Sequence, residues 1–198
     1  MKLSSLFRLG GAAILLAETL FAFGNLSYFL PVEQFSGAVT IWVSMFGHAF
    51  LALGLCALYA RQAQQGGWLG LAGFVLLLWG NMYSVGSDAV RMGVAQGAFT
   101  LEQVAQVAAY GIADSIFSWV WVLGTVALGV SVYRAGVFPK YAGLLFVLLG
   151  VVESLTGPLA VTRPVFMLVA FAAWVWPGLL LLTGREAAVM KAAPAASG

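Results

Sequence analysis

Two long segments without a charged residue, joined by a short basic turn, restrict the fold of this chain more than any other feature. Residues 116–133 and 141–152 contain no charged side chain, and each lies in a stretch that can provide the roughly 20 mostly apolar residues of a membrane-crossing helix. Between them, Arg134 suits the negative end of a helix, Gly136 can be left-handed just after it, and Pro139 is tolerated where the next helix begins. The pattern predicts a helical hairpin that turns at the basic, cytoplasmic face.

The composition indicates an integral membrane protein. Of the 198 residues 62% are hydrophobic and 8% are charged, with a mean hydropathy of +0.99, whereas soluble domains carry about 25% charged residues. Nine basic and seven acidic residues leave a formal charge of +2, which is too small to indicate nucleic-acid binding, and the chain has no basic tract. Cys56 is the single cysteine, so the chain forms no internal disulfide and no thiolate metal cluster.

Hydropathy divides the chain into six predicted membrane spans. They cover residues 9–29, 38–59, 68–85, 112–133, 141–161 and 165–182. An even number of spans puts both termini on one side, and seven of the nine basic residues then share that side. Because cytoplasmic loops are rich in Lys and Arg, we expect both termini in the cytoplasm.

The sequence therefore predicts an all-α integral protein of the bacterial inner membrane, built as a bundle of six transmembrane helices. A single transmembrane domain covers residues 1–185, and residues 186–198 form a short disordered cytoplasmic tail. Lys2 and Arg8 precede an apolar run, as in a signal peptide, but Glu18 interrupts that run and no convincing cleavage site follows. We expect this segment to be retained as the first span.

One outer loop is longer than the others. Residues 86–111 are too polar to continue the third span through lipid. Thr100 followed by Gln103 has the form of a capping box, so a helix is expected to begin near Leu101 and to run unbroken into the fourth span. This segment would lie on the membrane or project from it.

The basic turn carries a family resemblance. Residues 133–143, YRAGVFPKYAG, and the flanking spans resemble a family of small bacterial multi-pass membrane proteins that is defined only as a domain of unknown function. The resemblance is clearest over residues 110–182, and the matching positions are Arg134, Gly136, Pro139, Lys140 and Gly143. It implies a helical fold and a membrane location, and it implies no activity. The recurrence of Gly143, Gly150 and Gly157 also predicts a close helix contact.

Polar side chains within the predicted spans are the candidates for a functional site. An ionised side chain at the bilayer centre costs about 2.5 to 3.5 kcal/mol, so such residues usually face a bundle interior or a cavity. Helical spacing places Glu18 and Asn25 on one face of the first span, and Ser44 and His48 on one face of the second. We expect an outward-opening cavity whose candidate ligand-binding or proton-binding residues are Glu18, Asn25, His48, Asn81, Asp114, Ser118 and Glu153.

The depth of three of these residues in their spans gives a sharper prediction. Glu18, His48 and Glu153 are expected to line the same cavity, because this arrangement hides three costly groups from lipid at once. Asp88 and Arg91 are expected to form an ion pair one helical turn apart. Three tryptophans are expected near the cavity: Trp79, Trp119 and Trp121.

Three functions are compatible with this pattern, and we favour them in the following order. The first is the binding, or transport, of a small molecule or ion in the cavity. The second is a structural or assembly role in which polar side chains only fix helix packing, at about 0.6 kcal/mol for each interhelical hydrogen bond. The third is a membrane-embedded enzyme. One histidine, one cysteine and no phosphate loop or nucleophile elbow lead us to expect no catalytic residue, metal or cofactor. The lipid bilayer is the one partner that the sequence implies, and the oligomeric state is left open.

Overall fold

The computed structural model describes residues 3–26, 37–156 and 163–184, and this part of the chain is helical and contains no strand. Its elements are α1 (Leu3–Leu26), α2 (Gly37–Ala95), α3 (Leu101–Ala105), α4 (Ala108–Ala135), α5 (Lys140–Thr156) and α6 (Arg163–Thr183). Four helices in this part, α1, α2, α4 and α6, are long and apolar enough to cross a membrane. The all-α class is therefore confirmed, and the four long apolar helices are consistent with a membrane protein. The predicted tail, residues 186–198, lies outside the described residues.

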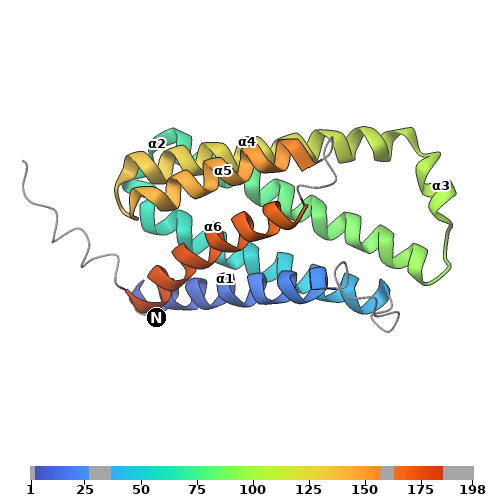
Figure 1. Cartoon of the computed structure of the whole chain (residues 1–198), viewed down its shortest axis with the longest axis horizontal. Helices are drawn as coiled ribbons and strands as arrows, with labels where there is room; N and C mark the ends of the chain where they lie inside the picture. Colours follow the sequence, from blue (N-terminus) through green and yellow to red (C-terminus); the bar gives the residue numbers. More distant parts are fainter. Residues whose placement is uncertain (1–2, 27–36, 157–162, 185–198) are drawn as a thin grey trace, which may run out of the picture.

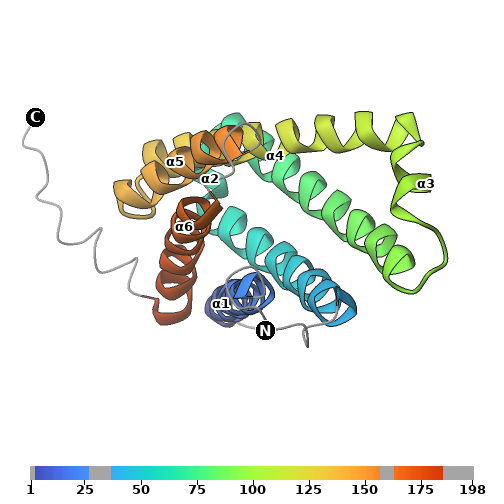
Figure 2. The same cartoon turned by 45° about the vertical axis from the view of Figure 1, so that its right-hand side comes forward.

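The longest helix, α2, folds back on itself at Gly67. This residue has φ 57° and ψ −160°, a conformation that glycine adopts without a steric penalty. Continuous helix would separate His48 from Asn81 by about 50 Å, whereas the two side chains are hydrogen bonded at 2.8 Å. The first limb (37–66) and the second limb (68–95) therefore run in opposite directions and form the V visible in Figures 1 and 2.

The second limb extends beyond the predicted end of the third span. It stays helical as far as Ala95, and the predicted ion pair explains how polar residues are accommodated there. Arg91 Nη1 donates to Asp88 Oδ1 at 2.9 Å, one turn apart on the same helix. The ion pair is therefore confirmed, and the turn begins ten residues later than expected, after position 95.

The short helix α3 is the predicted capped segment. Thr100 Oγ1 accepts from the backbone N–H of Gln103, and the Gln103 side chain accepts from the backbone N–H of Thr100, which confirms the capping box. The prediction of an unbroken helix into the fourth span is wrong, because α3 ends at Ala105 and α4 begins at Ala108. Val107, which lies between them, is extended with ψ 92°.

The hairpin between α4 and α5 has the predicted geometry. Gly136 ends α4 in the left-handed conformation with φ 65°, and α5 begins directly after Pro139. A Cβ atom on Gly143 would lie 2.6 Å from the carbonyl oxygen of Gly129, so the two backbones approach more closely than any side chain would allow. This contact confirms the predicted glycine face at Gly143, while Gly157 lies outside the described residues.

The long helices close into a ring. α1 packs against α2, α2 against α4, α4 against α5, α5 against α6, and α6 against α1 (Figure 2). The interior of the ring contains fully buried apolar side chains, among them Ile14, Leu55, Leu128, Phe146 and Trp174. The outer surface exposes many large apolar side chains, such as Trp42, Leu53 and Leu144. A continuous apolar surface of this kind is typical of contact with a membrane.

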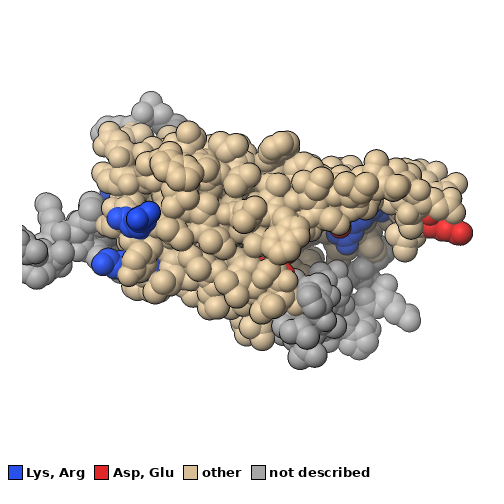
Figure 3. Space-filling model, turned by 90° about the horizontal axis from the view of Figure 1, so that it is seen from above, with Lys and Arg blue, Asp and Glu red and all other residues tan. Residues whose placement is uncertain are grey.

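Basic side chains gather at one end of the molecule. Figure 3 shows them at the left of the view, and Figure 1 places the start of α1, the fold of α2 and the α4–α5 turn at this same end. The residues concerned are Arg8, Arg61, Arg134 and Lys140. Two of these cations lie over aromatic rings, Arg61 over Phe7 and Lys140 over Tyr133, at 5.4 and 5.5 Å from the ring centroids. The opposite end carries α3 and the free ends of the V.

Candidate functional site

A cavity of about 590 Å³ lies inside the ring of helices. All five helices of the ring contribute lining residues, and pockets that bind small molecules commonly have volumes of about 300 to 1,000 Å³. The cavity runs from Glu18 toward the α3 end of the molecule, because Asn25 lies near the end of α1 and Thr40 near the start of α2. Its polar lining residues are Glu18, Asn25, Thr40, Ser44, His48 and Arg91.

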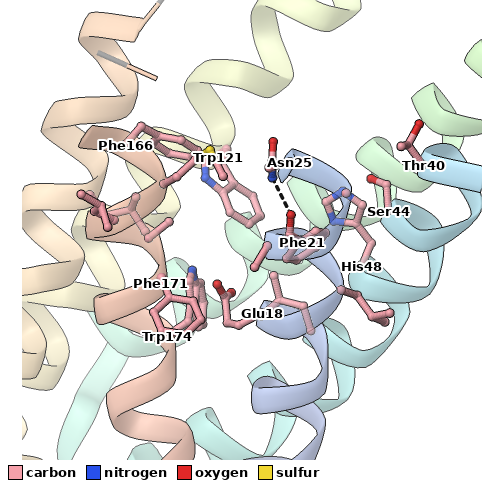
Figure 4. A pocket seen from close by; sticks show the side chains of 18 of the residues that line it. Glu18, Phe21, Asn25, Thr40, Ser44, His48, Trp121, Phe166, Phe171 and Trp174 are labelled. Carbon is pink, nitrogen blue, oxygen red and sulfur yellow. Dashed lines mark hydrogen bonds between the residues drawn. The ribbon is translucent and has the colours of Figure 1, made fainter. Parts of the chain in front are cut away.

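Glu18 is the most deeply buried of these polar residues. It is 5% exposed, and its side chain points from α1 toward Trp174 of α6 (Figure 4). Within the described part of the chain, its carboxyl group makes no hydrogen bond and no ion pair. Buried acids are normally paired or hydrogen bonded, because desolvation is costly. A buried acid that faces a cavity without a protein partner is therefore available to a ligand.

His48 is held in a defined tautomer by Asn81, which lies on the second limb of α2. The amide nitrogen of Asn81 donates to the backbone carbonyl oxygen of His48 at 2.7 Å, and a carbonyl accepts but cannot donate. This bond fixes the orientation of the amide, so Asn81 Oδ1 faces His48 Nδ1 at 2.8 Å. Because Oδ1 is an acceptor, Nδ1 carries the proton, and Nε2 is the ring nitrogen that is left for a further hydrogen bond. The ring edge also packs against Phe21, with centroids 4.9 Å apart.

Two residues near the outer end of the cavity donate to the backbone. Asn25 Nδ2 donates to the carbonyl oxygen of Phe21 at 2.7 Å, and the Thr40 hydroxyl donates to that of Gly37 at 3.0 Å. These bonds use the hydroxyl proton of Thr40 and one of the two N–H groups of Asn25. Both side-chain oxygens are therefore left as acceptors for a ligand, and Asn25 keeps one N–H donor.

Arg91 brings a positive charge to the cavity, and this charge is already balanced. Its guanidinium group is paired with Asp88. Asp88 is 3% exposed, while the Arg91 side chain is 53% exposed. The ion pair is neutral as a unit. The sequence pattern favoured an ion pair over a site for these two residues, and in the structure Arg91 forms the pair and also lines the cavity.

The wall opposite the polar residues is aromatic. Phe166, Phe171 and Trp174 extend from α6, and Trp121 extends from α4 (Figure 4). Trp174 is almost completely buried and packs edge-on against Phe146, with ring centroids 4.7 Å apart. Sequence reasoning did not find the α6 wall, because aromatic residues in an apolar span look the same whether they face lipid or a cavity. Their helical spacing was the available signal, because Trp174 lies three residues after Phe171 and eight after Phe166, and both spacings put residues on one face.

Four of the predicted site residues do not line the cavity: Asn81, Asp114, Ser118 and Glu153. Asp114 and Ser118 lie on the exposed side of α4, where Ser118 Oγ donates to the backbone oxygen of Asp114 at 2.9 Å. Glu153 is also absent from the lining, so the prediction that it shares a cavity with Glu18 and His48 is wrong. On α5 the lining residue is Leu149, one helical turn before Glu153.

The predicted tryptophans are also separated by the structure. Trp121 lines the cavity, whereas Trp79 and Trp119 are 58% and 60% exposed on the outside of the bundle. Asn81 does not line the cavity itself but orients His48, which does. The structure therefore brings Glu18, Asn25 and His48 together in one cavity.

The two titratable side chains Glu18 and His48 do not form a pair in the cavity. Glu18 and His48 line the same cavity but are not hydrogen bonded to each other in the described structure. Nucleophilic catalysis requires a nucleophile within hydrogen-bond reach of a base, and no such pair occurs among the described lining residues. These residues also contain no cluster of three or more His, Cys, Asp or Glu side chains that could hold a metal ion.

The chain matches no known protein family, no curated protein sequence and no solved structure. The family resemblance of residues 133–143 therefore stays a prediction. The cavity and its charges are the observations from which a function can be argued.

Proposed function

We propose that this chain is a multi-pass protein of the bacterial inner membrane in which six helical segments cross the bilayer. These segments are α1, the two limbs of α2, α4, α5 and α6. The gathering of Arg8, Arg61, Arg134 and Lys140 at one end supports an orientation with that end in the cytoplasm. In this orientation both termini are cytoplasmic and the cavity faces the outer side of the membrane.

The protein binds a small molecule or ion in this cavity. The observation that carries this proposal is Glu18, a buried acid that faces about 590 Å³ of space and has no partner among the described residues. An acid within the membrane is costly to retain, and such residues usually mark a ligand or ion pathway. If Glu18 served only helix packing, its carboxyl group would be expected to hydrogen bond to a neighbouring helix.

Filling the cavity tests this function directly. Ala170 on α6 lines the cavity, whereas Ala172 on the same helix is exposed on the outside. We expect Ala170→Trp to abolish stabilisation by ligands and Ala172→Trp to leave it unchanged, because the added indole occupies the cavity in the first variant alone. The measurement is the thermal unfolding of purified protein in nonionic detergent, with a panel of small organic cations, anions and neutral compounds.

Two results would contradict a binding function. In the first, no compound in the panel raises the unfolding temperature of the wild-type protein. In the second, compounds stabilise the Ala170→Trp and Ala172→Trp variants equally, which would place their binding outside the cavity.

A further inference from the structure

We propose that the ligand of this cavity is a monovalent organic cation with an apolar, preferably aromatic, body. This inference rests on the proposed binding function and adds the chemical class of the ligand. The cationic group lies beside the Glu18 carboxylate, and the apolar body lies against the aromatic wall formed by Phe166, Phe171 and Trp174.

The balance of charge favours a cation. The Arg91 guanidinium is paired with Asp88 at 2.9 Å, and His48 is hydrogen bonded to a neutral amide. Glu18 is therefore the one acid among the described lining residues that lacks a counter-charge. An opposite charge nearby stabilises the charged form of a carboxyl group that is withdrawn from water, and a bound cation supplies that charge.

The surroundings of Glu18 favour an organic cation over a metal ion. Hard metal ions such as Ca²⁺ take six to eight oxygen ligands, whereas Glu18 faces Trp174 and the aromatic wall (Figure 4). Aromatic faces attract ammonium-like cations with an energy of about 2 kcal/mol or more when the pair is withdrawn from water. A carboxylate beside several aromatic rings therefore recognises a cation that also carries apolar surface.

The size and polarity of the cavity agree with such a molecule. About 590 Å³ is more space than a single ion needs and lies within the range of pockets for small organic ligands. The outer part, where Asn25 and Thr40 present oxygen acceptors, would also favour a positively charged ligand as it enters. An anion would meet these acceptors and the Glu18 carboxyl group on its path.

The test uses three compounds of nearly equal shape and different charge. Tetraphenylphosphonium is a cation, tetraphenylsilane is neutral and tetraphenylborate is an anion. Binding to wild-type protein in nonionic detergent is measured by equilibrium dialysis. We expect the cation to bind at least about tenfold more tightly than the neutral compound, the difference corresponding to one cation–carboxylate contact with its aromatic surroundings. This comparison requires no variant.

Variants then assign the charge preference to Glu18. Glu18→Gln keeps the shape and the hydrogen-bonding capacity of the side chain but removes the charge, so the preference for the cation should fall by about tenfold. Glu18→Asp keeps the charge and should retain most of the preference. Glu102→Gln removes an exposed acid of α3 that is not part of the cavity lining. This control should leave the affinities for all three compounds unchanged. Each variant is first compared with wild type for its elution volume and unfolding temperature.

Failure of this inference can be distinguished from failure of the proposed function. In one outcome, Ala170→Trp blocks binding, but the protein binds the neutral or the anionic compound as tightly as the cation or more tightly. This result would support the binding function and overturn the inference that the ligand is a cation. A preference for tetraphenylborate would point to Arg91 instead. If none of the three compounds binds in a manner that Ala170→Trp blocks, the cation inference is overturned, and the broader panel decides whether the binding function stands.

Discussion

Asn81 makes two hydrogen bonds to His48 across the two limbs of α2, one to the imidazole ring and one to the backbone carbonyl. Asn81 is fully buried, so its amide group makes both bonds from inside the protein. They join the limbs that separate at Gly67 and also determine which ring nitrogen of His48 faces the cavity. The same pair therefore links the fold of α2 to the chemistry of the site.

Replacing Asn81 by Leu should lower the free energy of unfolding by about 1 to 3 kcal/mol, because the Nδ1–H of His48 is left without an acceptor in a buried position. The measurement is denaturant-induced unfolding in detergent. Ser84→Ala is the matched control: it lies one turn away on the same limb, and its hydroxyl donates to the carbonyl of Gly80 within the same helix. The control should change the unfolding free energy by less than about 0.5 kcal/mol. Equal effects of the two variants would mean that the two limbs do not depend on Asn81.

The close contact between α4 and α5 gives a second prediction. A Cβ atom on Gly143 would meet backbone atoms of Gly129 and Tyr133 at 2.6 Å, so Gly143→Ala should destabilise the protein by about 1 to 3 kcal/mol through overpacking. Gly111 on α4 has no atom within 4 Å of its Cβ position. Gly111→Ala should therefore be neutral or stabilise the helix by up to about 1 kcal/mol. The measurement is the unfolding temperature of the two variants in the same detergent. An unchanged unfolding temperature of Gly143→Ala would contradict the close approach of the α4 and α5 backbones.

Much of the fold could be predicted from residues with a strong local conformational preference. The α4–α5 turn was predicted because Arg134, Gly136 and Pro139 each have a local conformational preference that the tertiary structure does not override. The extension of the second limb to Ala95 was missed, since the pairing of Asp88 with Arg91 makes a polar stretch compatible with continued helix. The break after Ala105 was missed because capping residues mark where a helix begins, and nothing comparable marked its end.

The candidate site was predictable only in part, for a related reason. Glu18, Asn25 and His48 stand out as polar residues in apolar helices, and the structure brings them into one cavity. Helical spacing shows which residues share a face, but it does not show which neighbour that face meets. Glu153 was placed in the cavity on this incomplete information, and the α6 aromatic wall was missed for the same reason.

The proposed orientation predicts the location of two reporter fusions. A reporter fused after Lys191, in the C-terminal tail, should be active if it requires the cytoplasm and inactive if it requires the outer side. A fusion after Gly97, in the turn that follows α2, should show the opposite pattern, because four of the five basic side chains described by the structure lie at the other end of the bundle. Activity of both fusions on one side of the membrane would be inconsistent with the proposed crossings.

The last prediction concerns access of water to the cavity from the outer side. Ser44 lines the cavity, whereas Phe46 on the same limb is 55% exposed on the outside of the bundle, where we propose that lipid lies. The cysteine thiolate is the nucleophile that attacks a thiol-specific reagent, and it forms readily in water and poorly in apolar surroundings. In a chain whose single cysteine is replaced by Cys56→Ala, a Ser44→Cys variant should react with a membrane-impermeant reagent at least about tenfold faster than a Phe46→Cys variant.

The side of the membrane from which the reagent is added completes this test. In intact cells, where the reagent reaches the outer face alone, the Ser44→Cys variant should be labelled, and prior addition of tetraphenylphosphonium should slow that labelling because the cation occupies the same cavity. Labelling that occurs in inverted vesicles but not in intact cells would show that the cavity faces the cytoplasm and would overturn the orientation. Equal, slow labelling of both cysteine variants from both sides would show that water does not reach the cavity, in which case Glu18 could not receive a ligand from solution.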